Sequence, residues 1–235
     1  GDRSRLCYLV EGGHYGWSSG YENLTQFRRA LKINERKGPR YDDPWTNEGT
    51  WRPQFEGQPH FCIPSLLHID GGSAGLLFNS GESLGEKYKD SFIFTACTRG
   101  VYSFRTAQDG AGVKATRLHS IWEGGYFVDA ELSPDGALYI ADYVTTNNTP
   151  KGQGKGDIYT VVDEQARKKE SVIEASKFLS ADAKGYKLEN LISLLGHADR
   201  RVRLKAQFVI VRRDDMKSLA KVAHDPEQSL LPRLH

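Results

Sequence analysis

The side chains best suited to chemistry in this chain are carboxylates, aromatic rings and an arginine at the ends of predicted strands. Asp129 lies just before the turn sequence SPDG, and Asp142 and Tyr143 end the strand that follows this turn. Carboxylates at such positions accept hydrogen bonds from ligand hydroxyls, bind a cation, or bond to the backbone of a neighbouring strand. Arg99 stands at the edge of another predicted strand, where it holds an anionic group or pairs with a carboxylate. We interpret these four residues as candidate ligand contacts.

A second candidate group follows the first predicted strand. His14, Tyr15 and Trp17 lie on one loop. Aromatic rings on such a loop stack on a sugar ring or a flat cofactor, or they pack between neighbouring sheets. Both interpretations stay open at this level.

Other motifs for metal, nucleotide or redox chemistry are not recognisable. The histidines show no metal-ligand spacing, and the glycine-rich stretch 152–156 lacks the strand and helix that frame a phosphate loop. The cysteines form no CxxC pair, so we expect small buried side chains, or one disulfide and a remaining thiol. The residues concerned are His60, His68, His119 and His197, and Cys7, Cys62 and Cys97.

A basic run in the C-terminal part raises the question of nucleic acid binding. At helical spacing these side chains fall opposite an apolar stripe, and nearby aspartates offset their charge. We therefore predict a solvated helix face and no nucleic-acid partner. The run consists of Arg200, Arg201, Arg203, Lys205, Arg212 and Arg213.

Composition is typical of a folded globular chain. Of the 235 residues, 38% are hydrophobic and 26% charged, with a formal net charge of +2. The electrostatic field of a molecule with so small a net charge does not predict an anionic partner. No apolar run reaches the length of a membrane span, and the first residues lack a signal-peptide core. The first residue is Gly1, and a strand is predicted almost at once, so we expect a piece of a larger protein.

The elements that position the candidate residues change character near residue 163. Before it, short runs of β-branched and aromatic residues alternate with turn residues, which indicates successive hairpins. Two long loops, 18–59 and 144–156, interrupt this rhythm and are either functional or irregular. The predicted strands are 6–10, 61–68, 75–78, 91–95, 101–105, 116–122, 128–132, 137–143 and 157–162.

After residue 163 the apolar period becomes helical. We expect an amphipathic helix over 165–180, a helix that ends at Gly196, and another that begins after Asp199 as its N-cap. A further helix follows over 215–223, and one more opens near 225–226. Helix pairs of this spacing predict an α-solenoid, in which each unit needs neighbours to bury its apolar face.

Several segments resemble one family in its own order. Segment 8–17, YLVEGGHYGW, is similar to a segment of the membrane-bound dehydrogenase and haem-binding proteins of planctomycetes and verrucomicrobia, which contain a glucose/sorbosone (quinoprotein) dehydrogenase-like domain. The tail 194–208 resembles the HEAT-like repeats that follow this domain in the same proteins. Further matching segments are 52–59, 72–76, 88–92, 100–104, 132–143 and 156–159.

The resemblance implies a mainly β fold with an α tail. We expect a partial six-bladed β-propeller of about two to three blades over 1–163, a linker helix over 164–186, and truncated HEAT-like helices over 187–235. A propeller protects its sheet edges by closing into a ring, so a partial ring leaves an apolar face open. We therefore expect the missing propeller half, or other domains of the parent protein, as partners.

The resemblance also implies a function for the parent protein. Its relatives abstract a proton from a sugar or alcohol with a histidine and pass hydride to pyrroloquinoline quinone (PQQ) beside calcium. The base lies upstream of the matched region, so no catalytic residue is expected here, and haem c is expected on a cytochrome domain outside this chain. Arg99, Tyr126 and Asp129 then become the cofactor contacts. His14, Tyr15, Trp17, Asp142 and Tyr143 become the substrate contacts. The family location implies a periplasmic protein.

One departure from the family pattern favours a different function. Cations that hold the quinone carboxylates are replaced here by Thr98, Tyr126 and Val128. A non-catalytic propeller and HEAT scaffold that binds a carbohydrate or a protein partner is the alternative.

Overall fold

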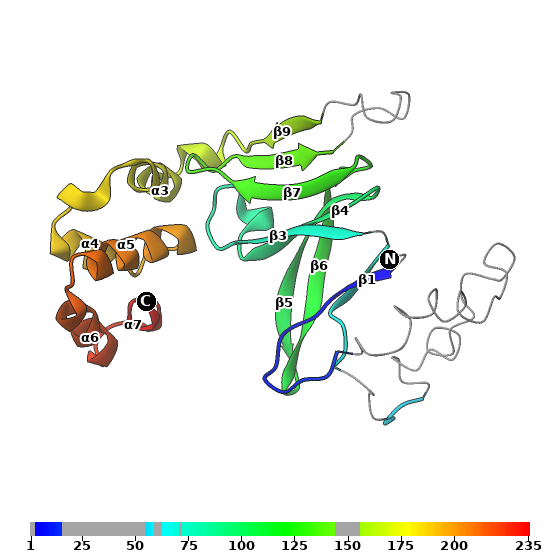
Figure 1. The fold of residues 1–235 in the computed structure, drawn as a ribbon, viewed down its shortest axis with the longest axis horizontal. Coiled ribbons are helices and arrows are strands. Elements are labelled where there is room, and N and C mark those ends of the chain that lie inside the picture. The colour runs from blue at the N-terminus through cyan, green and yellow to red at the C-terminus, as the bar shows by residue number, and fades with distance from the viewer. Residues whose placement is uncertain (1–2, 16–54, 59–62, 71, 144–155) are drawn as a thin grey trace, which may run out of the picture. The chain divides into compact units, whose positions relative to one another are not determined.

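The computed structural model describes residues 3–15, 55–58, 63–70, 72–143 and 156–235 (Figure 1). They form three antiparallel sheets of two, four and three strands, followed by five C-terminal helices. The chain divides into two compact units, one over 5–68 and one that holds 1–4 and 69–235. Within the described residues the sheets do not close into a ring.

The four-stranded sheet is a meander in which each strand pairs with the next along the chain. Alternation places Ile93 on the face that packs against Phe127, while Phe92 and Phe94 lie on the opposite face. On that opposite face Phe92 pairs with Phe104, and Phe94 pairs with Tyr102. The strands are β3 (Ser73–Asn79), β4 (Ser91–Ala96), β5 (Gly100–Asp109) and β6 (Gly112–Glu123).

The three-stranded sheet contains the predicted SPDG hairpin. The amide of Gly136 donates to the carbonyl of Ser133 at 3.0 Å, and Gly136 has φ +84°, which glycine adopts without strain. Phe127, Leu138 and Ile140 from this sheet join the buried core shared with the four-stranded sheet. The strands are β7 (Phe127–Leu132), β8 (Leu138–Asp142) and β9 (Asp157–Val161).

The two sheets meet where β3 contacts β7, and a glycine permits the close approach. A Cβ atom on Gly75 would lie 2.4 Å from Oδ1 of Asp129 and 2.9 Å from the amide nitrogen of Ala130. Both distances are far below van der Waals contact. Any side chain at residue 75 would therefore push β7 away from β3.

The two-stranded sheet corrects the first predicted strand. It pairs β1 (Arg3–Leu6) with β2 (Leu67–Asp70), whereas the sequence pattern predicted strands over 6–10 and 61–68. After Leu6 the chain turns, because the amide of Gly13 donates to the carbonyl of Val10 at 2.9 Å and Gly12 takes φ +71°. Residues 61–62, including Cys62, lie outside the described residues, as do 18–54 and 144–155 of the two predicted loops.

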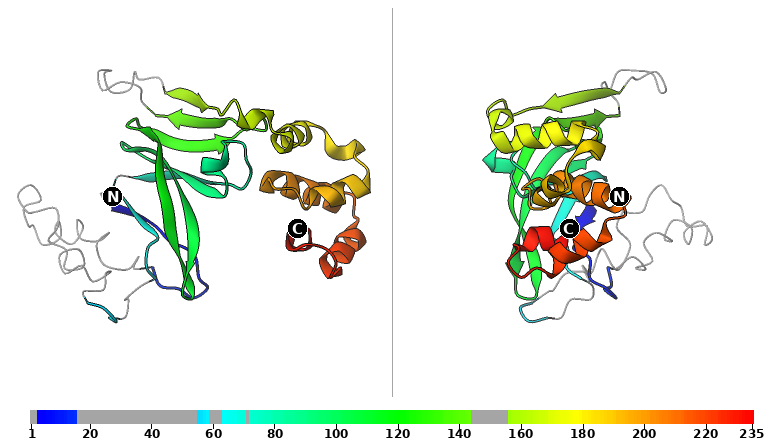
Figure 2. Two further views of the ribbon diagram at one scale, coloured as in Figure 1. Left: turned by 180° about the vertical axis from the view of Figure 1, so that it is seen from behind. Right: turned by 90° about the vertical axis from the view of Figure 1, so that its left-hand side faces the viewer.

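The C-terminal helices follow the two larger sheets in the chain and lie at one end of them (Figure 2). They share a buried core that includes Phe178, Leu191, Leu195, Val202 and Ile210. Among the described residues, no helix is both long and apolar enough to cross a membrane. The helices are α3 (Glu170–Ser180), α4 (Leu188–Leu194), α5 (Arg200–Arg212), α6 (Met216–His224) and α7 (Leu230–Leu234).

Helix boundaries confirm some predictions and correct others. Asp199 caps α5, and its carboxylate accepts a hydrogen bond from the amide of Arg201 at 2.8 Å. The helix predicted over 165–180 is divided, because Lys169 has an extended backbone between a 3-10 turn at Ala166–Lys168 and α3. The last helix begins at Leu230, later than predicted.

Candidate functional site

Three predicted site residues meet where β7 begins and β8 ends. The amide of Tyr143 donates to the carbonyl of Tyr126 at 3.0 Å, and the amide of Tyr126 donates to Oδ1 of Asp142 at 3.3 Å. The two tyrosine rings lie 6.2 Å apart and are 45% and 65% exposed. We call Tyr126, Asp142 and Tyr143 the tyrosine rim. It offers two accessible aromatic faces beside a carboxylate that is 8% exposed.

The backbone of Arg99 bonds to the segment just before the rim, at Gly124, two residues before Tyr126. It follows Thr98, which has φ +68° in the turn between β4 and β5, and its carbonyl accepts the amide of Gly124 at 2.9 Å. The same carbonyl accepts the hydroxyl of Tyr102 at 3.0 Å. Arg99 is exposed. The turn is therefore fixed by its backbone, which leaves a cation at the edge of the sheet.

The carboxylate of Asp129 makes a hydrogen bond within its own strand. Its Oδ1 accepts the amide of Ala130 at 2.9 Å, and its carboxylate packs against Gly75 of β3. The hydrogen bond lies within β7, so it is not the bond to a neighbouring strand that the sequence offered as one alternative, while the close approach to Gly75 brings the two sheets together. The side chain remains exposed enough to meet a ligand from solvent.

The aromatic loop residues belong to the unit over 5–68. The Tyr15 hydroxyl accepts the amide of Val10 at 2.6 Å and donates to the carbonyl of Tyr8 at 3.0 Å. Arg5 donates to the carbonyl of Tyr15 at 2.7 Å. Tyr15 therefore closes its own loop, with His14 beside it, while Trp17 lies outside the described residues.

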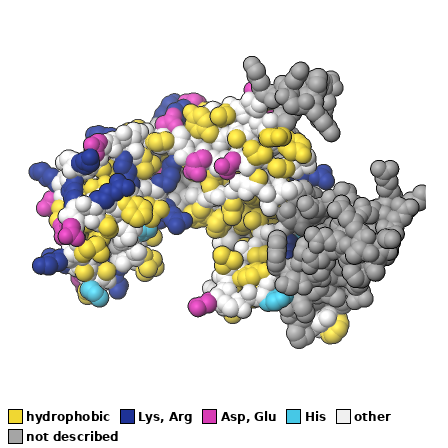
Figure 3. All heavy atoms as spheres, in the orientation of Figure 1, with side chains coloured by type: hydrophobic (Ala, Val, Ile, Leu, Met, Phe, Trp, Pro, Cys, Tyr) yellow, Lys and Arg dark blue, Asp and Glu magenta, His cyan; other side chains and the backbone are white. Residues whose placement is uncertain are grey.

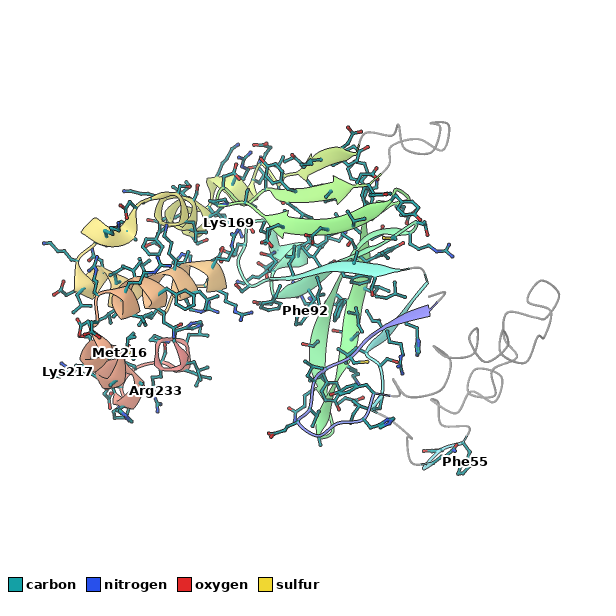
Figure 4. The ribbon with its side chains drawn as sticks, viewed as in Figure 1. Phe55, Phe92, Lys169, Met216, Lys217 and Arg233 are labelled. Carbon is teal, nitrogen blue, oxygen red and sulfur yellow. The ribbon has the colours of Figure 1, made fainter. Side chains whose placement is uncertain are left out.

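A polar cluster that the sequence did not predict joins the helices to the sheets. Lys169 and Ser171 each donate to the carboxylate of Glu82 at 2.9 Å, and the amide of Arg200 donates to the hydroxyl of Ser80 at 2.7 Å. Lys169 is labelled at this place in Figure 4. We call these residues, together with His197, Asp199 and Arg201, the sheet–helix junction.

Arg201 is the centre of this junction. Its Nη1 donates to the carbonyls of Leu132 and Ser133 in the β7–β8 hairpin at 2.8 and 2.7 Å. Its Nη2 donates to Oδ2 of Asp199 at 2.6 Å. One guanidinium thus satisfies a buried carboxylate and two backbone carbonyls.

The prediction of a solvated basic face is wrong for half of the run, which is buried or partly buried. Arg203 is 6% exposed and donates to the carbonyls of His197 and Ala198 at 2.6 and 2.7 Å. Arg201 and Lys205 are partly buried, and Lys205 also donates to backbone carbonyls. Arg200, Arg212 and Arg213 are exposed, although Arg213 donates to the carbonyl of Lys184. These cations bind the carbonyls left unpaired at helix ends and turns. Sequence periodicity does not show those acceptors.

Charge compensation shifts the pKa of each carboxylate at the junction. Burial opposes ionisation of Asp199, yet the hydrogen bonds and positive charge of Arg201 hold its pKa below the ordinary value. Hydrogen bonds from Lys169 and Ser171 lower the pKa of Glu82. The same contact with Glu82 raises the pKa of Lys169. Asp199, Glu82 and Lys169 are all charged at neutral pH in this structure.

A small, partly open cavity of about 10 Å³ lies at the junction, lined by Glu82, Pro134, Ser171, Val172 and His197 among others. This volume holds about one water molecule. It is too small for a sugar or a quinone. The junction therefore connects the helices to the sheets and is not a substrate pocket.

The described residues near the rim do not fit PQQ. Its carboxylates need cations, and the expected positions hold an exposed Thr98, Tyr126 and a half-exposed Val128, with Arg99 as the cation at this edge. The described residues contain no group of three or more side chains arranged to hold a metal ion. No family model, no curated protein and no solved structure matches this chain.

Proposed function

We propose that this chain is part of a quinoprotein-dehydrogenase-like propeller protein and that its tyrosine rim binds a carbohydrate. The observation that carries the binding proposal is the rim itself. Two exposed rings suit the apolar face of a sugar, and the adjacent carboxylates of Asp142 and Asp129 suit its hydroxyls. The motif order in the sequence supports the family.

The arrangement of the two larger sheets supports a pair of adjacent propeller blades. Each sheet is an antiparallel meander, and their first strands, β3 and β7, contact each other. First strands line the centre of a propeller, so Gly75 and Asp129 would lie near its axis. The described strands would then account for about two blades.

An aromatic face on the four-stranded sheet supports a further blade beside it. Phe78, Phe92 and Phe104 stack across this face, with ring centroids 4.8 and 5.2 Å apart. At its margin Leu76 is 53% exposed and Phe78 is 36% exposed. Figure 3 shows hydrophobic side chains at the surface of the sheets as well as the helices. A neighbouring sheet of the parent protein is the proposed cover.

The helices support a HEAT-like continuation. α4 packs against α5, and α6 packs against α7, as in stacked helix pairs. Leu230 and Leu234 of α7 are 66% and 68% exposed, which suits a further repeat. We also propose a periplasmic location, as the family resemblance implies.

Binding at the rim is tested by calorimetry of the full chain against a panel of monosaccharides and oligosaccharides. Tyr126→Ala and Tyr143→Ala are expected to weaken any observed affinity at least about tenfold, because each removes a stacking face. Tyr139→Ala is the matched control, since Tyr139 is similarly exposed on the same sheet outside the rim. Equal affinity in all three variants would place binding elsewhere, and no binding to the panel would contradict the proposal.

A second candidate function is redox chemistry in the parent protein. The exposed Arg99 beside the rim favours it, because a cation at this edge suits an anionic cofactor. In that case Arg99 would contribute one cation to the cofactor site. The base and the remaining PQQ and calcium contacts would lie on residues outside this chain, and electrons would pass to a haem c domain. Calorimetry of the full-length parent with PQQ and calcium tests it: calcium-dependent uptake supports the oxidoreductase, and no uptake supports the scaffold.

A further inference from the structure

His197 occupies an unusual position at the sheet–helix junction, just before the N-cap of α5. Its side chain is 7% exposed. Its Nδ1 accepts the amide of Asp199 at 2.9 Å. A backbone N–H always donates, so this bond requires an unprotonated Nδ1 and places the proton of the neutral ring on Nε2.

The other ring nitrogen has no hydrogen-bond partner among the described residues. Nε2 is buried, and the nearest carboxylate oxygen is Oε2 of Glu174 in α3, at 3.6 Å. A buried polar atom without a partner is costly, and in a folded protein such an atom calls for a specific explanation. The ring also lines the cavity described above.

Charged groups surround the ring from every element at the junction. Glu174 from α3 and Asp199 from its own segment favour a positive ring, and Glu82 lines the same cavity from the segment after β3. Arg201, which also lines the cavity, and Arg203, which donates to the His197 carbonyl, oppose a positive ring. The hydrogen bond at Nδ1 is the contact that a proton on this nitrogen would break directly.

Protonation at Nδ1 would set two donors against each other. The Asp199 amide would lose its acceptor, and the ring would have to turn, toward Glu174. Asp199 caps α5 and aligns Arg201, whose guanidinium holds the β7–β8 hairpin. A change at His197 would therefore reach the contact between helices and sheets through a continuous set of bonds.

We propose that His197 is a proton-sensitive latch that keeps the helices docked on the sheets while it is neutral and releases them when it is protonated. Histidine is the side chain whose charge ordinarily changes between pH 5 and 8. If the surroundings of an exported protein became acidic, the C-terminal helices would lose their contacts at the sheet–helix junction while the sheets stayed folded. The periplasmic location rests on the proposed function, whereas the latch does not.

The test is amide hydrogen exchange of the full chain at pH 8 and pH 5, corrected for intrinsic rates. The Arg200 amide is the reporter because it bonds Ser80 across the junction. Its protection is expected to fall about tenfold at pH 5, while Ile93 in the core of the four-stranded sheet stays protected. His197→Gln keeps an acceptor and a donor but does not titrate, so its Arg200 protection should not change with pH.

Two further measurements complete the test. His224→Gln, at an exposed histidine on α6, should behave as the wild type. The ring of His197, followed by NMR, should titrate with the same midpoint as the loss of Arg200 protection. The latch is overturned if His197→Gln loses protection as the wild type does, if Arg200 stays protected at pH 5, or if the ring titrates without a change at Arg200.

Discussion

The tyrosine rim and the sheet–helix junction differ in how they use polar groups. At the rim, the side chains of Tyr126 and Tyr143 are exposed, and the backbone holds them in place. At the junction, Asp199 and Arg201 are largely buried and bond to each other and to the backbone of the β7–β8 hairpin. The rim therefore has exposed surface available for a ligand, while the polar groups of the junction are used in hydrogen bonds within the protein.

Arg201→Ala should give the largest effect on stability. It leaves the buried carboxylate of Asp199 and two carbonyls without their donor, at a cost of about 3 kcal/mol in the free energy of unfolding. Urea unfolding followed by fluorescence measures it. Arg200→Ala is the control, because that side chain is exposed and should change stability by less than about 0.5 kcal/mol. Similar costs for both variants would refute the role of the junction.

Gly75→Ala should come next. The added Cβ would overlap Asp129 and the amide of Ala130, so β3 and β7 must separate, at a cost of about 2 kcal/mol. Gly72→Ala is the control, because its nearest atom, Cβ of Cys97, is at 3.8 Å. Thermal unfolding of both variants measures the difference. A Gly75→Ala protein as stable as Gly72→Ala would show that the two sheets do not approach as described.

Glu82→Gln should have a smaller effect that depends on pH. The folded pKa of Glu82 lies below its ordinary value of 4.5, so its charge stabilises the fold above that value and the gain is lost as pH falls through the folded pKa. Because the contact is partly exposed, we expect a loss below about 1 kcal/mol at pH 7. Urea unfolding at pH 7 and pH 3 should show a smaller difference between variant and wild type at pH 3, below the ordinary pKa of the group. A constant difference would assign the effect to packing.

Tyr143→Ala should change stability least, by less than about 0.5 kcal/mol, because the ring is 65% exposed. Combined with the loss of carbohydrate binding proposed above, this result would separate a ligand contact from a structural one. Thermal unfolding beside calorimetry measures both. A large loss of stability would instead assign the ring to packing at the end of β8.

The sequence predicted the elements that depend on local patterns. Strands around Ile93 and Ile140, the SPDG hairpin and the Asp199 cap are confirmed, because alternation, turn chemistry and capping are written in neighbouring residues. The first strand was wrong because the turn at Gly12 and Gly13 outweighs the β-propensity of the residues before it.

The junction could not be predicted, since its bonds join residues far apart in the chain. Arg201 and Ser133 are separated by 68 positions, and Lys169 and Glu82 by 87. Their acceptors include backbone carbonyls, which every residue carries and no composition reveals. Asp142 and Tyr143 of the rim were named from a predicted strand end and Tyr126 from the family resemblance, but the contact between the two tyrosines was not predicted.

The hydrogen bonds of Lys205 should make its amine less reactive than those of exposed lysines. Its ammonium donates to the carbonyls of Phe178, Leu179 and Ala181 at 2.7 to 2.8 Å, which commits all three of its protons. An amine must shed a proton to act as a nucleophile, and here each proton closes the end of α3. Acylating reagents should therefore label Lys205 last among the lysines of the helices, which would make its labelling rate a reporter of native packing.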